Sequence, residues 1–287
     1  MTGPGLVASA TLAAIVGGCA SNPTPKEHPP EAGEVRFLTY NVHGLLEFIT
    51  GDDTPARMLG ISPLLAEFDV AGIQENFFYS EQLMTEVEHP HVAHFDTVDE
   101  GRTTSSGLTI ASRPAIEGSE GEAWRLCHGI AGNASDCLAT KGLQWSRLRV
   151  GEAPYATIDV FNLHMEAGGS DKDIEARTSD VTQLLENIAG RSEGHAVVAL
   201  GDFNLRPTDD EDVPLLERLV GEGGLTELCG VVGCPEPNHI DRFYVRDGER
   251  VALAPRDWRR EEQFVDADGV NLSDHPALSA RIAWSTR

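Results

Sequence analysis

Short apolar runs rich in β-branched residues recur from residue 35 onward, and most of them stop at a glycine or a polar residue. Such runs predict buried strands, here at 35–41, 70–74, 108–112, 143–149, 156–163, 196–200, 240–245 and 277–283. Longer stretches with apolar side chains at helical spacing predict helices at 57–67, 80–88, 174–188 and 214–220. Many strands with few helices predict sheets packed face to face, with the helices outside.

Composition limits the classes of partner. With 287 residues, of which 40% are hydrophobic, the chain can bury a full core. Its 46 acidic and 22 basic residues give a formal charge of -24. Such a surface repels polyanions, and the sequence has no Lys/Arg-rich run with interleaved aromatic residues. Duplex nucleic acid is therefore not the expected partner.

The N-terminal segment is distinct from the predicted domain. Residues 6–16 form an apolar stretch too short to span a bilayer, and Gly17-Gly18-Cys19 follows it. This pattern resembles a bacterial lipoprotein signal, with Cys19 as the lipidated first residue. Residues 1–6 carry no Lys or Arg, which departs from most export signals, and a structural N-terminal helix is the alternative. We predict a signal peptide at 1–18, a Pro-rich tether at 19–33 and one domain at 34–287, in an exported protein that is an envelope lipoprotein or secreted.

Four further cysteines form two local pairs. Cys127 and Cys137 are one pair, and Cys229 and Cys234 are the other. An even number of cysteines in an exported protein predicts two disulfides, each closing a short loop. Neither spacing is the Cys-x-x-Cys typical of zinc sites, so a metal site is the weaker alternative.

Polar residues that suit one reaction follow strand after strand. They are Asn41, Glu75, His164 and Asp202 with Asn204, while Asp241 lies near the start of the strand predicted at 240–245, and Asp274 and His275 precede the last strand. Each residue alone is compatible with a turn or a helix cap. Together, at the ends of strands that share a sheet edge, they predict a catalytic site.

The same residues lie in motifs that resemble the endonuclease/exonuclease/phosphatase superfamily. The motifs, in family order, are Thr39-Tyr40-Asn41-Val42-His43-Gly44, Ile73-Gln74-Glu75, Ser106-Gly107-Leu108-Thr109-Ile110-Ala111-Ser112, Asn162-Leu163-His164, Gly201-Asp202-Phe203-Asn204, Ile240-Asp241-Arg242 and Ser273-Asp274-His275. The resemblance covers about residues 35–284 and implies a four-layer α/β sandwich of two mixed sheets flanked by helices. Arg177 matches a recurrent arginine of the superfamily, and we expect a structural ion pair there.

Residue types and the resemblance agree on the roles at this site. Glu75, Asp274 and the amide oxygen of Asn41 are hard ligands suited to Mg²⁺, with Mn²⁺ or Ca²⁺ as alternatives. His275 is the expected general base, and Asp241 is expected to orient its imidazole. Asp202 and Asn204 are expected to position the attacking water, and His164 to contact a phosphate oxygen.

These roles predict a metal-dependent phosphodiester hydrolase, which we expect to be a monomer. The net charge and the predicted lipid anchor favour a phospholipid or small phosphodiester over nucleic acid. The stretch from Asp136 to Ala139, with Lys141 and Gly142, is also similar to a segment of sphingomyelinase-like members of the superfamily. The alternatives are an exported endonuclease and, from another class, a catalytically inactive binding module on the same fold.

Overall fold

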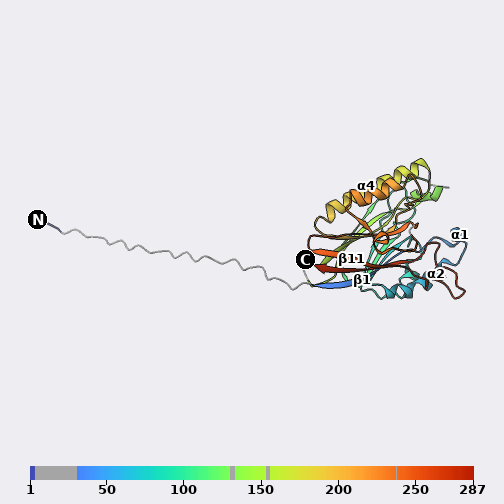
Figure 1. The fold of residues 1–287 in the computed structure, drawn as a ribbon, viewed down its shortest axis with the longest axis horizontal. Helices are drawn as coiled ribbons and strands as arrows, with labels where there is room; N and C mark the ends of the chain where they lie inside the picture. Colours follow the sequence, from blue (N-terminus) through green and yellow to red (C-terminus); the bar gives the residue numbers. More distant parts are fainter. Residues whose placement is uncertain (4–30, 130–132, 153–155, 237) are drawn as a thin grey trace.

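The computed structural model describes residues 1–3, 31–129, 133–152, 156–236 and 238–287, and its strands form two six-stranded sheets (Figure 1). The first sheet has the order β11 (Val251–Arg260), β12 (Leu278–Thr286), β1 (Ala32–Asn41), β2 (Val70–Gln74), β4 (Leu108–Ser112) and β3 (His91–Phe95). The second has the order β5 (Ala115–Ala123), β6 (Gly142–Arg149), β7 (Thr157–His164), β8 (Ala196–Asp202), β10 (Asp241–Arg246) and β9 (Thr226–Glu227). Both sheets are mixed, because β1 with β2 and β7 with β8 are parallel pairs among antiparallel ones.

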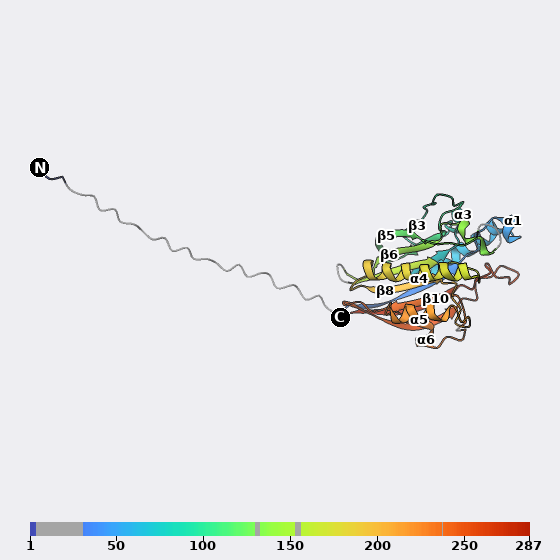
Figure 2. The same cartoon turned by 90° about the horizontal axis from the view of Figure 1, so that it is seen from above.

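Helices cover the outer faces of both sheets (Figure 2). The helices are α1 (Glu47–Thr50), α2 (Thr54–Ile61), α3 (Ser80–Leu83), α4 (Asp171–Arg191), α5 (Val213–Gly221) and α6 (Leu228–Val232), with 3-10 turns η1 (Ser62–Glu67) and η2 (Asn133–Leu138). Of these, α2 and α3 pack on the first sheet and α4 and α5 on the second, while α6 packs on the cluster between the sheets. In Figure 1 the chain enters β1 at the end of the molecule where the C-terminus lies, and α1 lies at the opposite end.

Three buried clusters hold the four layers together. One lies between the sheets, one under α4 and α5, and one under α2 and η1. Gly72 shows how closely the sheets approach, since a Cβ there would lie 2.1 Å from Leu200 Cδ1 of the facing sheet. The predicted α/β sandwich of two mixed sheets flanked by helices is confirmed.

All eight predicted strands are present, with ends shifted by a few residues at most. The sequence did not indicate the edge strands β3, β5, β9 and β11. Edge strands carry polar and charged side chains, which hides the apolar alternation that marks a strand. β5, with the exposed Glu117 and Glu120 and the half-buried Glu122, is such a case.

Two predicted helices are shorter than expected. The helix predicted at 57–67 is α2 followed by the 3-10 turn η1, which begins at Ser62 with Pro63 next. Proline has no N–H for the helical hydrogen bond and disfavours helical geometry in the residue before it. The helix predicted at 80–88 ends at Leu83.

Both predicted disulfides are present. Cys127–Cys137 has a Cα–Cα distance of 5.4 Å, and Cys229–Cys234 has one of 5.0 Å. The predicted signal peptide, Cys19 and most of the tether lie outside the described residues. β1 begins at Ala32, which pairs with Ser285, so the last two residues of the predicted tether lie in this strand. No helix in the described parts of the chain is long and apolar enough to cross a membrane.

Arg177 on α4 forms the expected structural ion pair. Its Nε and Nη2 donate to Asp212 Oδ1 at 3.1 and 3.0 Å, its Nη1 donates to Gly168 O at 2.6 Å, and both partners of the ion pair are buried. We expect Arg177→Met to lower the free energy of unfolding by about 3–5 kcal/mol, because it leaves Asp212 charged and buried. Urea denaturation would measure this. Arg218→Met, which breaks the exposed pair with Glu222, is the control and should cost much less; equal losses would contradict the interpretation.

Candidate functional site

Strand register brings the predicted site residues to one edge of the two sheets. Asn41 ends β1 opposite Gln74, the last residue of β2. In the second sheet, Asp202 at the end of β8 pairs with both His164 of β7 and Asp241 of β10. The facing sheets therefore deliver amide, imidazole and carboxylate groups to a common edge, as the sequence predicts.

The backbone turns sharply directly after these strands. His43, Glu75 and Asn204 have φ values of 49°, 57° and 50°, a left-handed conformation that is uncommon for residues other than glycine. Gly44 donates its N–H to Glu75 O at 3.0 Å, and a Cβ at Gly44 would lie 2.5 Å from that oxygen. Backbone strain of this kind costs about 1–3 kcal/mol per residue and concentrates at functional sites.

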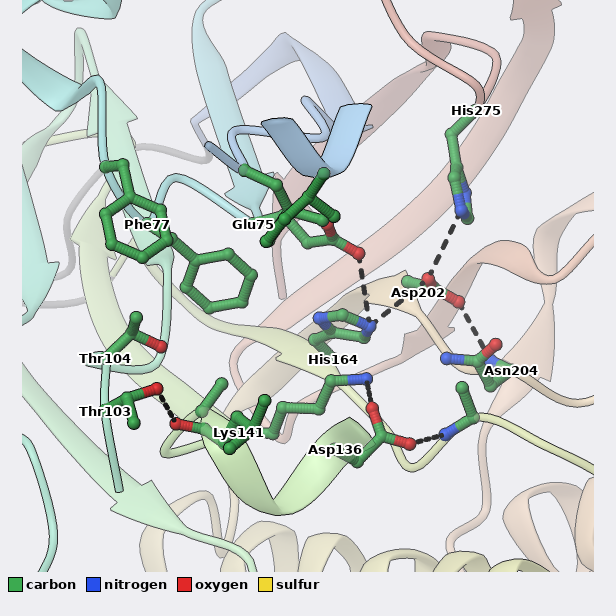
Figure 3. A pocket seen from close by; sticks show the side chains of 16 residues that line it. Glu75, Phe77, Thr103, Thr104, Asp136, Lys141, His164, Asp202, Asn204 and His275 are labelled. Carbon is green, nitrogen blue, oxygen red and sulfur yellow. Dashed lines mark hydrogen bonds and ion pairs between the residues drawn. The ribbon is translucent and has the colours of Figure 1, made fainter. Parts of the chain in front are cut away.

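The strand ends open into a cavity of about 420 Å³ (Figure 3). Its lining joins a polar floor to an apolar rim. The floor includes Glu75, Asp136, Lys141, His164, Asp202, Asn204 and His275, and the rim includes Leu45, Ile49, Phe77, Phe78 and Leu138. A small set of polar groups within a largely apolar pocket is the usual composition of a small-molecule site.

Asp202 lies at the centre of the polar floor. Its Oδ2 accepts a hydrogen bond from Asn41 Nδ2 at 3.3 Å and lies 3.5 Å from His164 Nε2 and 3.8 Å from His275 Nε2. Its Oδ1 accepts the backbone N–H of Asn204 at 3.0 Å. Burial, followed by the nearby charge of Asp241, raises the pKa of Asp202 to about 6.

His275 and Asp241 form an oriented pair. His275 Nδ1 lies 2.9 Å from Asp241 Oδ2, and Asp241 is almost fully buried. Burial lowers the pKa of His275, but the charge and hydrogen bond of Asp241, then the charge of Asp202, outweigh it and raise the pKa to about 10. In a catalytic triad a carboxylate at this position fixes the imidazole tautomer, and that role for Asp241 stays a prediction.

Asp241→Asn should lower the pKa of His275. The amide keeps the shape of the side chain but removes the negative charge that raises this pKa most. The imidazolium should then lose its proton at a lower pH than in the wild type. An NMR titration of the His275 ring measures both values directly. Asp257→Asn, far from the ring on β11, should leave the titration unchanged, and an unshifted His275 in Asp241→Asn would contradict the pairing.

His164 and Glu75 face each other across the floor. His164 Nε2 lies 3.9 Å from Glu75 Oε1, while its buried Nδ1 has no hydrogen-bond partner. Burial, then the positive charge of Lys141, lowers the pKa of His164 well below its usual range, so the ring is neutral near pH 7. Burial raises the pKa of Glu75, although Lys141 and Asn41 oppose this.

Lys141 is a floor residue to which the sequence assigned no role. It directly precedes β6, pairs with Asp136 and donates to Met165 O at 3.4 Å. Burial lowers its pKa, but the charges of Asp136 and Glu75 outweigh burial and keep the ammonium protonated. The floor therefore offers one buried cation beside its carboxylates.

Of the three predicted metal ligands, Glu75 lines the cavity, whereas Asn41 and Asp274 contact other protein groups. Asn41 turns its amide nitrogen to Glu75 Oε1, at 2.8 Å, and its oxygen accepts the backbone N–H of His43 at 3.0 Å. Asp274 lies 3.6 Å from His43 Nδ1, and its side chain is 60% exposed. Ligation by Asn41 and Asp274 stays a prediction. The described residues also place Asp202, Asp241 and His275 close enough to share an ion.

A family model fits this arrangement. The model of the Endonuclease/Exonuclease/phosphatase family matches residues 38–275, from within β1 to His275. The chain belongs to this family. The superfamily predicted from the motifs is thereby confirmed, and membership supports the prediction of a phosphodiester hydrolase.

Curated relatives narrow the resemblance. The chain is 28% identical over 273 residues to a protein named Sphingomyelinase of Mycobacterium tuberculosis, a match that covers 86% of this chain and 52% of that protein. A Sphingomyelinase of Mycobacterium bovis matches to the same extent. The chain therefore spans about half the length of the curated relatives it matches.

Solved structures share the fold. A mutant of beta toxin from Staphylococcus aureus, with bound magnesium ions, has a TM-score of 0.62 at 13% identity, over 86% of this chain and 99% of that one. D. rerio TDP2, complexed with single strand DNA product, has a TM-score of 0.63 at 17% identity, over 87% of this chain and 98% of that one. At these identities the likeness extends to the architecture alone.

Proposed function

We propose that this chain hydrolyses phosphodiesters with the help of a divalent metal ion and acts on a phospholipid of the sphingomyelin class. One observation carries the proposal: a single pocket floor joins the His275–Asp241 pair to the carboxylates of Asp202 and Glu75. Family membership and the name of the curated relatives support it.

The floor has the donor set of a magnesium site. Burial raises the pKa of both Glu75 and Asp202, so the negative charge there is incompletely balanced by the protein. Mg²⁺ is commonly held by one or two carboxylates together with waters and substrate phosphate oxygens. Glu75, which lines the pocket, would hold it. A ligand role for Asn41 requires its amide to turn, and one for Asp274 requires the carboxylate to leave His43.

A bound Mg²⁺ would neutralise charge on the phosphate oxygens and offset the carboxylate charge that raises the pKa of His275. His275 Nε2 then accepts a proton from the attacking water, while Asp241 holds the ring by Nδ1. Asp202 orients that water. Asn204, whose Nδ2 donates to Met165 O at 3.0 Å, has its amide plane fixed beside Asp202.

Two further side chains meet the phosphate. His164 is neutral and can donate from Nε2, and Lys141 brings a buried positive charge to the same floor. Donors aimed at oxygens on which charge develops stabilise the transition state. Water attack on phosphorus breaks the P–O bond to the leaving alcohol, which takes up a proton, and leaves a phosphomonoester.

The rim favours a lipid substrate over a polyanion. Ile49 and Phe78 line the cavity and are 55% and 41% exposed, and Phe48, next to Ile49 on α1, is 83% exposed. Exposed apolar side chains grouped at a pocket mouth suit contact with a lipid. The net charge of -24 opposes long nucleic acid.

We expect EDTA to abolish hydrolysis of sphingomyelin and excess Mg²⁺ to restore it, because the carboxylate floor alone leaves the phosphate charge unscreened. The same preparation should be assayed with sphingomyelin, phosphatidylcholine, single-stranded and duplex DNA, and a phosphomonoester, with Mg²⁺, Mn²⁺ or Ca²⁺ present. Hydrolysis that survives chelation would remove the metal from the proposal. Rapid cleavage of DNA without lipid hydrolysis would identify an exported nuclease instead, and no turnover of any substrate would leave a binding module.

We further propose that the chain is exported, with a signal peptide at 1–18, a lipid on Cys19 and a tether that leads to the domain. The two disulfides support an oxidising compartment. Mass spectrometry of the mature N-terminus decides this: a diacylglyceryl-modified Cys19 is expected, and an intact residue 1 would contradict export of this kind.

A further inference from the structure

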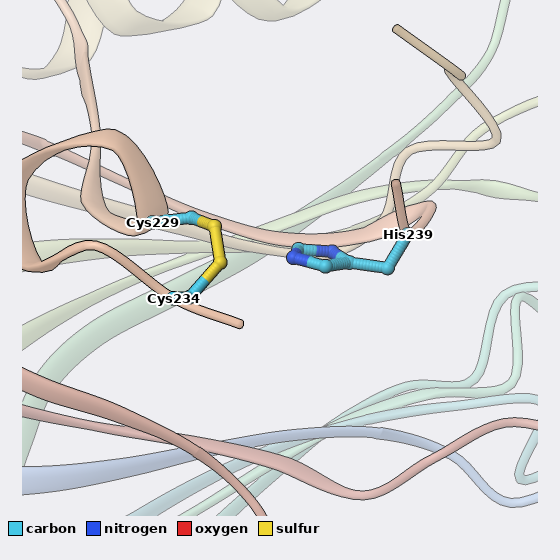
Figure 4. Close-up of side chains that lie close together, drawn as sticks. All are labelled: Cys229, Cys234 and His239. Carbon is cyan, nitrogen blue, oxygen red and sulfur yellow. A yellow bond between two sulfur atoms is a disulfide. The ribbon is translucent and has the colours of Figure 1, made fainter. Parts of the chain in front are cut away.

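Two cysteines and a histidine meet outside the pocket, between α6 and β10 (Figure 4). Cys229 lies on α6, Cys234 follows that helix, and His239 lies before β10. The two Sγ atoms and one nitrogen of His239 all lie within 4.8 Å of one another. Figure 4 shows the imidazole directed at the sulfur atoms.

The imidazole of His239 is held mainly by an aromatic contact. Its ring stacks on Trp258, with centroids 5.3 Å apart, and both ring nitrogens are buried without a hydrogen-bond partner. Buried polar atoms are nearly always hydrogen-bonded, so an imidazole with neither nitrogen bonded requires an explanation.

We propose that Cys229, Cys234 and His239 are the protein ligands of a Zn²⁺ site that exists only while the Cys229–Cys234 disulfide is reduced. The spacing Cys-x₄-Cys falls within the range of zinc sites, and two thiolates with one imidazole are typical zinc ligands. Water would complete the tetrahedron. The inference is independent of the proposed hydrolase activity.

An external thiol or phosphine would reduce the Cys229–Cys234 disulfide. Two electrons and two protons convert the disulfide to two thiols, and the reductant is oxidised. Zn²⁺ then binds both sulfur atoms and a nitrogen of His239, and the two thiol protons are released. Transfer of two electrons from the two thiolates to a low-molecular-weight disulfide, which is reduced to two thiolates, expels the ion and restores the Cys229–Cys234 bond.

The other disulfide lacks these features. Beside Cys127 and Cys137 lies Arg102, whose Nη1 donates to Cys127 Sγ and to Cys137 O, each at 2.8 Å. A permanent cation at that position disfavours a metal ion. Among the described residues, no histidine or carboxylate lies close enough to this pair to share an ion with it. The chain therefore contains its own control for a pair of cysteines without a site.

Co²⁺ binding tests the proposal, because thiolate ligation gives a near-ultraviolet charge-transfer band that oxygen ligands at the pocket do not give. Full-length chain with Cys19→Ser, produced in a reducing cytosol so that the pair is never oxidised, would be titrated with Co²⁺ and then with Zn²⁺ under nitrogen. We expect one thiolate-bound Co²⁺ per chain, displaced by Zn²⁺, and none in the oxidised protein. His239→Ala should weaken binding by roughly 100-fold or more, since even outer-sphere partners of a metal contribute 10–100-fold.

Paired variants decide between the two cysteine pairs. Cys127→Ser/Cys137→Ser should keep the band, and Cys229→Ser/Cys234→Ser should lose it, with circular dichroism confirming the fold of each. A band that persists in the second variant, equal affinity in His239→Ala, or no band in folded, reduced protein would overturn the proposal. Loss of the fold on reduction would also overturn it, since the site requires a folded reduced state.

Discussion

His275→Ala should lower kcat for phosphodiester hydrolysis by about 10²–10⁴-fold, the usual contribution of a general base. The ring occupies the position where Asp241 fixes Nδ1 at 2.9 Å and directs Nε2 toward Asp202 at 3.8 Å. Alanine removes the proton acceptor and leaves the phosphate contacts of the floor in place. KM should therefore change much less than kcat. Steady-state assays with sphingomyelin at saturating Mg²⁺ measure both constants.

His91→Ala is the matched control for this variant. His91 is a partly exposed residue on the edge strand β3, and its loss should leave kcat within about twofold, as for surface substitutions. His91→Ala should unfold at a temperature close to the wild type, whereas His275→Ala should unfold at a lower one, because it leaves Asp241 buried without its ion-pair partner. Near-normal turnover by His275→Ala, in protein shown to be folded, would exclude His275 as the base.

Asp202→Asn should reduce kcat by a comparable factor, about 10²–10⁴-fold. The amide preserves shape and can still accept the N–H of Asn204, but it loses the charge that orients the water and faces His275 and His164.

The stability of the folded protein, unlike its activity, should not fall in Asp202→Asn. The pKa of Asp202 is raised to about 6 in the folded chain, so the folded state binds the proton more tightly than the unfolded state, and stability falls as the pH rises through that range. At pH 7 in EDTA, Asp202→Asn should therefore unfold at a temperature no lower than the wild type.

Glu75→Gln provides the comparison that separates water orientation from metal binding. Glu75 is the predicted ligand that already lines the pocket, so its amide variant should need more Mg²⁺ for half-maximal activity. Asp202→Asn should stay inactive however much Mg²⁺ is added. If excess Mg²⁺ restored Asp202→Asn fully, Asp202 would be a metal ligand only and its role with the water would be wrong.

The central strands could be predicted from the sequence because a strand that is buried on both faces consists of consecutive apolar residues. β2 and β4 were predicted with their correct ends, and β8 was predicted two residues short of Asp202. Edge strands have one or more solvated faces, so β5 and β11 carry charges that the sequence shares with loops. Pairing partners cannot be read from one strand alone, and this is why the sheet order required the structure.

Polar residues after strands were visible as candidates because parallel strands end at one edge. Lys141 precedes its strand instead. β6 is antiparallel to β7, with Leu143 opposite Leu163, so the start of β6 lies at the edge where β7 ends. That direction is not encoded in the residues around Lys141. The orientation of the Asn41 amide was equally beyond prediction, since it depends on Glu75, Asp202 and the His43 backbone together.

The chain enters the domain at the end opposite the pocket, and this sets a reach for any lipid anchor. β1 has ten residues, so its start lies roughly 30 Å from the pocket edge at about 3.3 Å per residue. If Cys19 is anchored, residues 19–31 extend to roughly 45 Å at most. An anchored segment of this length could extend along the side of the domain, so the pocket opening could face the membrane that holds the anchor. A segment several residues shorter could not reach past the domain. The pocket would then face away from the anchoring membrane and could act only on a neighbouring surface.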